Sequence, residues 1–171
     1  MRRRIRATSR RRNPVEVLVS GGMDSAALLA YYARQDFDVR AVFVNFGQPA
    51  AKQEVKAATS LSKHYRVPLS IFRSRCDATF SAGEISGRNA FLLFAAILAR
   101  QGRSGMIAVG IHEGPPYYDC TEGFLNAVQV IVNGYAAGCI RVAAPFLKWN
   151  KRMIWDFCKK YGVPVHLTYS C

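Results

Sequence analysis

Short apolar runs rich in β-branched residues alternate with longer segments of helical periodicity from Val15 to the end of the chain. This order is typical of parallel strands joined by crossover helices. The predicted strands are residues 15–19, 39–45, 68–72, 106–110, 140–143 and 163–167, and the predicted helices are residues 24–34, 49–65, 88–101, 122–136 and 149–161. The sequence therefore predicts an α/β fold with a doubly wound, mostly parallel sheet and flanking helices.

The first predicted strand ends in the segment Ser20-Gly21-Gly22-Met23-Asp24-Ser25, and a run of good helix formers follows at once. Two glycines allow a sharp turn and a close approach to a ligand, and the amide groups and dipole at a helix start favour an anion. The two serines can add hydroxyl donors, and Asp24 can cap the helix or help to hold Mg²⁺. An ordinary tight turn with a polar cap explains the same residues, and both interpretations stay open.

Two common phosphate loops are absent near this strand, because neither G-x-x-x-x-G-K-S/T nor G-x-G-x-x-G occurs there. The segment instead resembles the S-G-G-x-D-S motif of the ATP-pyrophosphatase families at every specified position. The resemblance implies an adenine nucleotide α-hydrolase-like fold of the HUP type. It also implies that ATP is bound by this loop and is cleaved between its α and β phosphates.

Further segments, in the same order, resemble the 7-cyano-7-deazaguanine synthase family of queuosine biosynthesis. Asn45-Phe46-Gly47-Gln48 is similar to the Y-G-Q turn of that family, and Glu54 matches a glutamate that follows it. The other similar segments are residues 87–89 with the apolar helix 91–99 (G-R-N-x-x-F-L-x-x-A-A), 110–113 (G-V-x-E), 118–120 (Y-P-D-C), 145–151 (P-L-x-W-x-x-K) and 167–171 (T-x-S/T-C).

This resemblance implies a carbon–nitrogen ligase that activates a carboxylate as an acyl-adenylate, releases pyrophosphate and uses ammonia to convert 7-carboxy-7-deazaguanine into 7-cyano-7-deazaguanine. The implied catalytic residues are Asp24, Ser25, Arg88 and Lys151. The implied ATP-binding residues are Ser20, Gly21, Gly22, Met23, Asp24, Ser25, Asn45 and Gly110. The implied substrate-binding residues are Gln48, Arg88, Asn89, Glu113, Tyr118 and Asp119.

Ordinary roles remain open for several of these side chains. Asn89 can be the N-terminal cap of a helix, and Lys151 can be a solvated surface lysine. His112, next to Glu113, can be either a site residue or a structural one. Arg88 lies at a predicted helix start, where we expect a second contact to an anion.

The sequence departs from the family in two places. In the family, three more cysteines follow the position of Cys171 and hold zinc with it, whereas this sequence stops at Cys171, so we expect either a truncated chain or a shortened relative without zinc. The loop before Tyr118 is also short and carries Pro115-Pro116. The acceptor could therefore be another carboxylate, a tRNA base or a protein terminus. A catalytically degenerate nucleotide-binding module is the third alternative.

The formal net charge of +13 is concentrated at the start of the chain, where seven arginines lie between Arg2 and Arg12. We expect residues 1–13 to be a disordered arm, with RNA binding as the alternative, and residues 14–171 to be one catalytic domain.

The longest apolar runs are too short to cross a membrane. The five cysteines are odd in number and widely spaced, which predicts a reduced, cytoplasmic environment, with Cys139 and Cys158 as small buried side chains. The sequence leaves the oligomeric state open, a homo-oligomer included.

Overall fold

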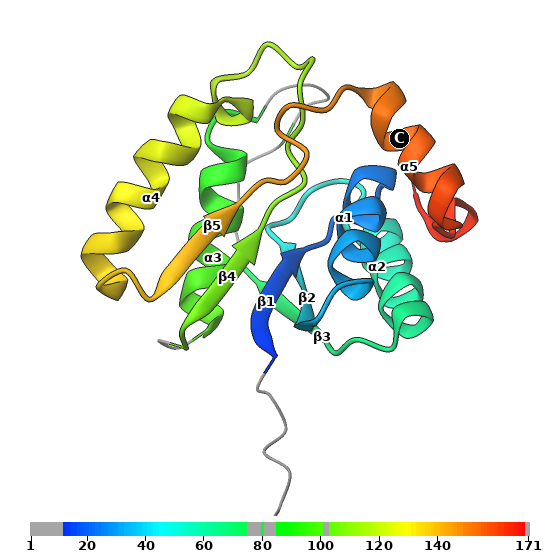
Figure 1. Ribbon diagram of the computed structural model, residues 1–171, viewed down its shortest axis with the longest axis horizontal. Coiled ribbons are helices and arrows are strands. Elements are labelled where there is room, and N and C mark those ends of the chain that lie inside the picture. The colour runs from blue at the N-terminus through cyan, green and yellow to red at the C-terminus, as the bar shows by residue number, and fades with distance from the viewer. Residues whose placement is uncertain (1–11, 75–79, 81–84, 101–102, 170–171) are drawn as a thin grey trace, which may run out of the picture.

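The computed structural model describes residues 12–74, 80, 85–100 and 103–169. Its strands are β1 (Asn13–Leu18), β2 (Phe37–Asn45), β3 (Leu69–Arg73), β4 (Gly105–Ala108) and β5 (Ile140–Ala143). Its helices are α1 (Met23–Ala33), α2 (Ala51–Tyr65), α3 (Arg88–Arg100), α4 (Glu122–Ala136) and α5 (Lys151–Tyr161), with short 3-10 turns at η1 (Tyr118–Cys120) and η2 (Val165–Leu167). The strands form one parallel sheet in the order β3-β2-β1-β4-β5 (Figure 1).

The sheet reverses its winding between β1 and β4. Strand β1 pairs with β2 on one side and with β4 on the other, so that Val15 aligns with Val39 and with Met106. The chain leaves β1 toward α1 on one face of the sheet and leaves β4 toward α4 on the other face (Figure 1). Such a switch point opens a crevice at the carboxyl ends of the strands, where ligands of this class of fold bind.

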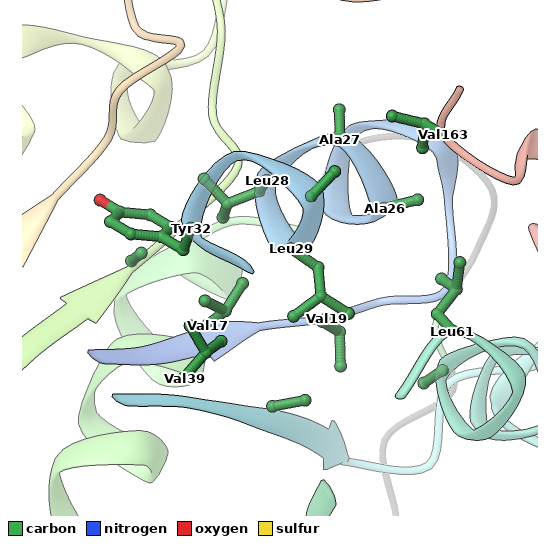
Figure 2. Packing of buried hydrophobic residues seen from close by; sticks show 14 of the residues in the cluster. Val17, Val19, Ala26, Ala27, Leu28, Leu29, Tyr32, Val39, Leu61 and Val163 are labelled. Carbon is green, nitrogen blue, oxygen red and sulfur yellow. The ribbon is translucent and has the colours of Figure 1, made fainter. Parts of the chain in front are cut away.

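Each face of the sheet has its own hydrophobic core. Alternate side chains of β1 enter opposite cores: Val15 and Val17 pack with α1, α2 and α5, whereas Leu18 packs with α3 and α4. Figure 2 shows Val17 and Val19 beneath Leu28 and Leu29 of α1. Helix α1 is buried almost all round, since residues 25–30 and Tyr32 are inaccessible to solvent. The start of α1, and the loop before it, are therefore held firmly.

The predicted strand at residues 163–167 is wrong. Its second half is the 3-10 turn η2, and Val163 and Leu167 are apolar because they pack against the core under α1 and α5. Pro164 lacks an amide group for a strand ladder, which disfavours pairing at this position. The other five strands and all five helices begin and end within two residues of the predicted bounds.

Two smaller findings concern individual side chains and helix lengths. Cys158 is buried as predicted, but Cys139 is exposed, because it lies beyond the end of α4 rather than on its packed face. Within the described ranges, none of the helices has both the length and the apolar character needed to cross a bilayer.

Candidate functional site

The loop between β1 and α1 turns at two glycines. Gly21 has a φ of +83°, and a Cβ on it would lie 2.7 Å from the carbonyl oxygen of Glu54 in α2. The backbone angle and the close packing against α2 both require glycine at this position. Gly22 is the N-cap of α1 and, within the described residues, makes no side-chain cap hydrogen bond. The first amide groups of α1 are thus left for a ligand at the positive end of the helix dipole.

The two serines of the loop are linked to each other. Ser25 is buried and donates its hydroxyl hydrogen to the carbonyl oxygen of Gly22 at 2.9 Å, while the Ser20 hydroxyl lies 3.5 Å from that of Ser25. Ser20 is exposed. The loop therefore offers one hydroxyl that already fixes its turn and a second that can rotate toward an incoming oxygen.

Asp24 is the centre of a charged group that three distant segments bring together. One of its oxygens, Oδ2, accepts a hydrogen bond from Lys151 Nζ at 2.5 Å and lies 3.6 Å from His112 Nε2. Lys151 opens α5, where the Asn150 side chain caps the helix by accepting from the amide of Met153. The predicted pair Asp24 and Lys151 thus forms one site, although the two residues are far apart in the sequence.

His112 is a member of this group that the sequence left undecided. Its Nδ1 lies 2.7 Å from the carbonyl oxygen of Glu113, and because a carbonyl only accepts, that nitrogen carries a hydrogen. The ring is almost fully buried, with Nε2 toward Asp24. The signal that could have identified His112 is its position in the loop after β4, the strand next to β1 at the switch point of the sheet.

The donor set around Asp24 fits a magnesium ion that arrives with phosphates. Asp24 Oδ1 is buried and has no hydrogen-bond partner among the described residues, so this oxygen is available to a hard cation. Mg²⁺ commonly takes only one or two carboxylates and completes its shell with water and phosphate oxygens. In the described part of the chain, no group of three or more His, Cys, Asp or Glu side chains could hold a metal ion by itself.

Zinc has no comparable support in the described residues. Cys171, the ligand that the family resemblance implies, lies outside them, as does Cys76. Cys158 is buried in the core, and burial, followed by the negative charge of Asp24, raises the pKa of its thiol to about 11. A thiol with so high a pKa stays protonated near neutral pH, so Cys158 is a packing residue rather than a nucleophile or a ligand.

The C-terminal segment packs directly on the glycine loop. The amide of Tyr169 donates to the carbonyl oxygen of Gly21 at 2.9 Å, and the Tyr169 carbonyl oxygen would lie 3.7 Å from a Cβ on Gly22. The sequence predicted a strand at residues 163–167, just before Tyr169, and did not predict this contact with the glycine loop. Through Tyr169 the segment holds the loop at Gly21.

The turn after β2 is closed by its own polar side chains. Gln48 donates to Glu54 Oε2 at 2.7 Å and accepts from the amide of Phe46 at 3.0 Å, and Asn45 accepts from the amide of Gly47. Gln48 and Asn45 were predicted to bind substrate and ATP, respectively. In the structure both side chains stabilise the turn. The hydrogen bond from Gln48 to Glu54 also links the turn to α2, the helix that packs on Gly21.

The start of α3 is capped from a distant loop. Asp119 Oδ2 accepts from the amide of Asn89 at 3.2 Å, and the Asn89 side-chain amide donates to the carbonyl oxygen of Asp119 at 3.3 Å. Asn89 is buried, so its side chain holds the loop of η1 on α3 instead of capping its own turn. Asp119, which was predicted to bind substrate, already has this structural partner.

An apolar pocket of about 290 Å³ opens beside the start of α3. Three phenylalanines from different segments line it, with Phe46 lying edge-on to Phe80 and to Phe91. Arg88 is exposed and contributes to the wall of the pocket. A planar ring with an attached anion matches this combination of aromatic walls and a guanidinium group.

The loop after β4 brings the remaining predicted residues to the same edge of the sheet. Gly110 lies next to the first turn of α1, since a Cβ on it would be 3.5 Å from the carbonyl oxygen of Asp24. The amide of Glu113 donates to the carbonyl oxygen of Trp149, while its side chain is exposed. Tyr118 is also exposed and packs edge-on against Phe124.

Comparisons with known proteins identify the relatives of this chain. The sequence model of queuosine biosynthesis protein QueC matches residues 15–84 and 75–171. The 7-cyano-7-deazaguanine synthase of Aquifex aeolicus (strain VF5) is 32% identical over 186 residues, which cover 91% of this chain and 85% of the relative. The synthase of the same name from Methanoculleus marisnigri is 31% identical over 183 residues, 90% of this chain and 82% of the relative.

Solved structures with the same fold are more distant in sequence. The tRNA thiolase NcsA from Methanococcus maripaludis has a TM-score of 0.57 at 16% identity, covering 95% of this chain and 62% of that one. NMN synthetase from Francisella tularensis has a TM-score of 0.57 at 14% identity, covering 91% and 64%. These likenesses confirm the adenine nucleotide α-hydrolase-like fold. The family model and the two synthases show more: the chain belongs to the QueC family of queuosine biosynthesis proteins and is a ligase-type enzyme.

Proposed function

We propose that the chain binds ATP at residues 20–25 and uses it to activate a carboxylate, most specifically that of 7-carboxy-7-deazaguanine. A carboxylate oxygen attacks the α phosphorus, the bond between the α phosphorus and the bridging oxygen breaks, and pyrophosphate leaves. Ammonia then attacks the acyl carbon, AMP leaves with the carboxylate oxygen, and the amide loses a proton. The amide oxygen then attacks the α phosphorus of a second ATP, pyrophosphate leaves, and loss of AMP with that oxygen and of both N–H protons gives the nitrile.

The observation that carries this proposal is the open start of α1 beside Asp24 and Lys151. Amide groups at a helix start, a rotatable hydroxyl on Ser20 and a lysine ammonium are the groups that stabilise phosphoryl oxygens as charge develops on them. Because no side-chain nucleophile is needed, the rate comes mainly from position and electrostatic stabilisation. Mg²⁺ bound with the nucleotide would neutralise phosphate oxygens, and Asp24 Oδ1 is the atom that would hold it.

Lys151 has a particular part in this proposal. Its ammonium contacts Asp24 in the structure and its side chain is more than half exposed, so it can turn from the carboxylate to a phosphate oxygen without crossing the core. His112 Nε2 lies 3.6 Å from the same oxygen of Asp24, Oδ2, and limits the rotation of the carboxylate. We assign Lys151 to charge neutralisation and His112 to the position of Asp24.

The acceptor binds, in this proposal, in the pocket beside α3. A deazaguanine ring stacks among Phe46, Phe80 and Phe91, and the Arg88 guanidinium pairs with its carboxylate. Asn89 and Asp119 hold the start of α3 and thereby fix Arg88. In this proposal, residues 14–171 act as one catalytic unit.

The test measures AMP and pyrophosphate formed from ATP, 7-carboxy-7-deazaguanine and ammonium. Replacing Asp24 by Ala should lower the rate at least about tenfold, as expected for the loss of one oriented contact to the transition state. Asp156→Ala is the matched control, because that carboxylate is exposed on α5 and pairs only weakly with Arg152. With ¹⁸O in the substrate carboxylate, one label should appear in AMP. Formation of ADP and phosphate instead would refute the proposed cleavage.

A further inference from the structure

A second pocket lies at the end of the sheet opposite to the candidate site. It has a volume of about 270 Å³ and lies at the amino ends of β1 and β2, next to the end of α3 (Figure 1). The charged residues that line it are Glu16, Asp38, Arg40, Arg100 and Arg103. Pockets for drug-sized ligands measure about 300–1,000 Å³, so this pocket suits a smaller metabolite.

The pocket combines charges of both signs. Glu16 of β1 aligns in register with Arg40 of β2, and Asp38 lies two residues before Arg40, so these three side chains share one face of the sheet. Arg100 comes from the end of α3, and Arg103 comes from the turn between α3 and β4. Three guanidinium groups and two carboxylates give this pocket a formal charge of +1.

One oxygen of Glu16 is buried without a hydrogen-bond donor among the described residues. Glu16 is only 5% exposed, and its Oε1 accepts from Arg103 at 3.4 Å, whereas Oε2 lies 3.8 Å from Arg100 Nη1. Arg100 cannot turn toward Oε2, because its guanidinium already donates to three backbone carbonyl oxygens. A buried carboxylate oxygen without a donor is unfavourable, and a ligand that brings an N–H group would remove this cost.

Asp38 and Arg40 add two charges that no neighbour neutralises. Both residues are exposed, and neither makes an ion pair or a side-chain hydrogen bond within the described part of the chain. An anion alone would be repelled by the two carboxylates of the pocket, and a cation alone would be repelled by its three guanidinium groups. A ligand that carries a cationic donor next to an anion satisfies both sets of charges.

We propose that this pocket binds a free α-amino acid with an acidic side chain, such as L-glutamate. The ammonium group donates to Glu16 Oε2 and pairs with Asp38, while the two carboxylates pair with the exposed guanidinium groups of Arg40 and Arg103. The net charge of such a ligand is −1, which balances the charge of the pocket. The site is separate from the activation of a carboxylate by ATP, because β1 runs from this pocket to the glycine loop at its other end.

The test is isothermal titration calorimetry of the full chain with L-glutamate at neutral pH and low salt. We expect binding with a dissociation constant of about 1 mM or lower. Glutarate keeps both carboxylates but lacks the ammonium group, and L-glutamine keeps the ammonium group but lacks the second carboxylate. Each should bind at least about tenfold more weakly than L-glutamate, because each loses one set of charge-assisted hydrogen bonds.

Two substitutions place the binding in this pocket. Arg40→Met and Asp38→Asn should each weaken the binding of L-glutamate at least about tenfold, and both should fold normally because the two side chains are exposed. Arg141→Met, the same change at an exposed arginine of β5 outside the pocket, should leave the affinity unchanged. No binding of L-glutamate up to about 10 mM, equally tight binding of glutarate, or full affinity in Arg40→Met would overturn the proposal.

Discussion

A carboxylate lies beside cations at both ends of β1, but the two ends differ in how freely the cation can move. At the amino end, Glu16 contacts Arg100 and Arg103, and both Glu16 and Arg100 are buried. At the carboxyl end, Asp24 contacts Lys151, whose side chain is 58% exposed. Charge pairing alone therefore does not identify a catalytic site in this molecule.

The hydrogen bonds of the two cations explain the difference. Arg100 donates to the carbonyl oxygens of Arg103, Met106 and Ser104, so its guanidinium holds the turn between α3 and β4. Lys151 extends from the first turn of α5 into the site and can exchange one anion for another. The amino end holds a structural ion pair, whereas at the carboxyl end the proposed function requires phosphate to replace Asp24 as the partner of Lys151.

The largest effect that this comparison predicts is the loss of stability on replacing Arg100 by Met. The change removes three hydrogen bonds to carbonyl oxygens and leaves Glu16 buried beside fewer cations. Breaking a buried pair in this way should lower the free energy of unfolding by about 3–5 kcal/mol. Urea denaturation followed by circular dichroism measures it.

Arg103→Met is the matched control, because Arg103 also contacts Glu16 but has an exposed side chain. An exposed ion pair contributes at most about 1 kcal/mol, so the control should be nearly as stable as the wild type. Equal losses in the two variants would mean that the charge of the arginine, and not its burial among carbonyl groups, holds the turn.

The next effect is on turnover. Lys151→Met should reduce AMP formation about 100-fold or more, the usual loss for one donor that stabilises a developing phosphoryl charge. Its thermal midpoint should change little, because the side chain is exposed and its pair with Asp24 is only partly buried. Steady-state kinetics and a thermal melt of the same sample separate the two quantities.

Lys159→Met provides the comparison on the same helix. Lys159 is exposed, and its ammonium lies 5.1 Å from the centre of the Trp155 ring. Within the described part of the chain, its side chain has no ion pair. Its replacement should leave turnover within about twofold of the wild type. If Lys151→Met lost stability in proportion to activity, Lys151 would be a structural residue like Arg100, and the contrast between the two ends of β1 would fail.

The sequence predicted the fold well because strands buried on both faces read as continuous apolar runs. It failed at residues 163–167, where apolar residues pack against the core instead of pairing in the sheet and Pro164 disfavours a strand. The glycine loop was predictable for a local reason, since Gly21 and Gly22 adjoin both the strand and the helix that define it.

The contacts across the fold were less accessible from the sequence. Lys151 was named, but its contact with Asp24 depends on how α5 returns to α1, and nothing local encodes that distance. The sequence does carry a signal for the ion pair of Glu16, because a glutamate inside a buried strand requires a buried cation. Arg100, at the end of an apolar helix, was the available candidate.

The smallest effect concerns pH and Glu16. Burial raises the pKa of the Glu16 carboxyl above its ordinary value of 4.5, whereas the positive charges of Arg100, Arg103 and Arg40 oppose this rise. Asp38 lines the same pocket as Glu16. A carboxyl with a raised pKa in the folded state binds more protons there than in the unfolded state. Its contribution to stability is therefore present below pH 4.5 and is lost as the pH rises through the folded-state pKa.

Glu16→Gln removes this titration, so the stability of the variant relative to the wild type should increase as the pH rises above 4.5. Urea unfolding of both proteins between mildly acidic and neutral pH measures the difference, which cancels the titration of all other groups. A difference that decreases with pH would mean that attraction by the three arginines outweighs burial at the amino end of β1. The ionised carboxylate would then stabilise this end of the strand. Its pair with Arg100 would be lost only when the pH falls through the lowered pKa of the Glu16 carboxyl.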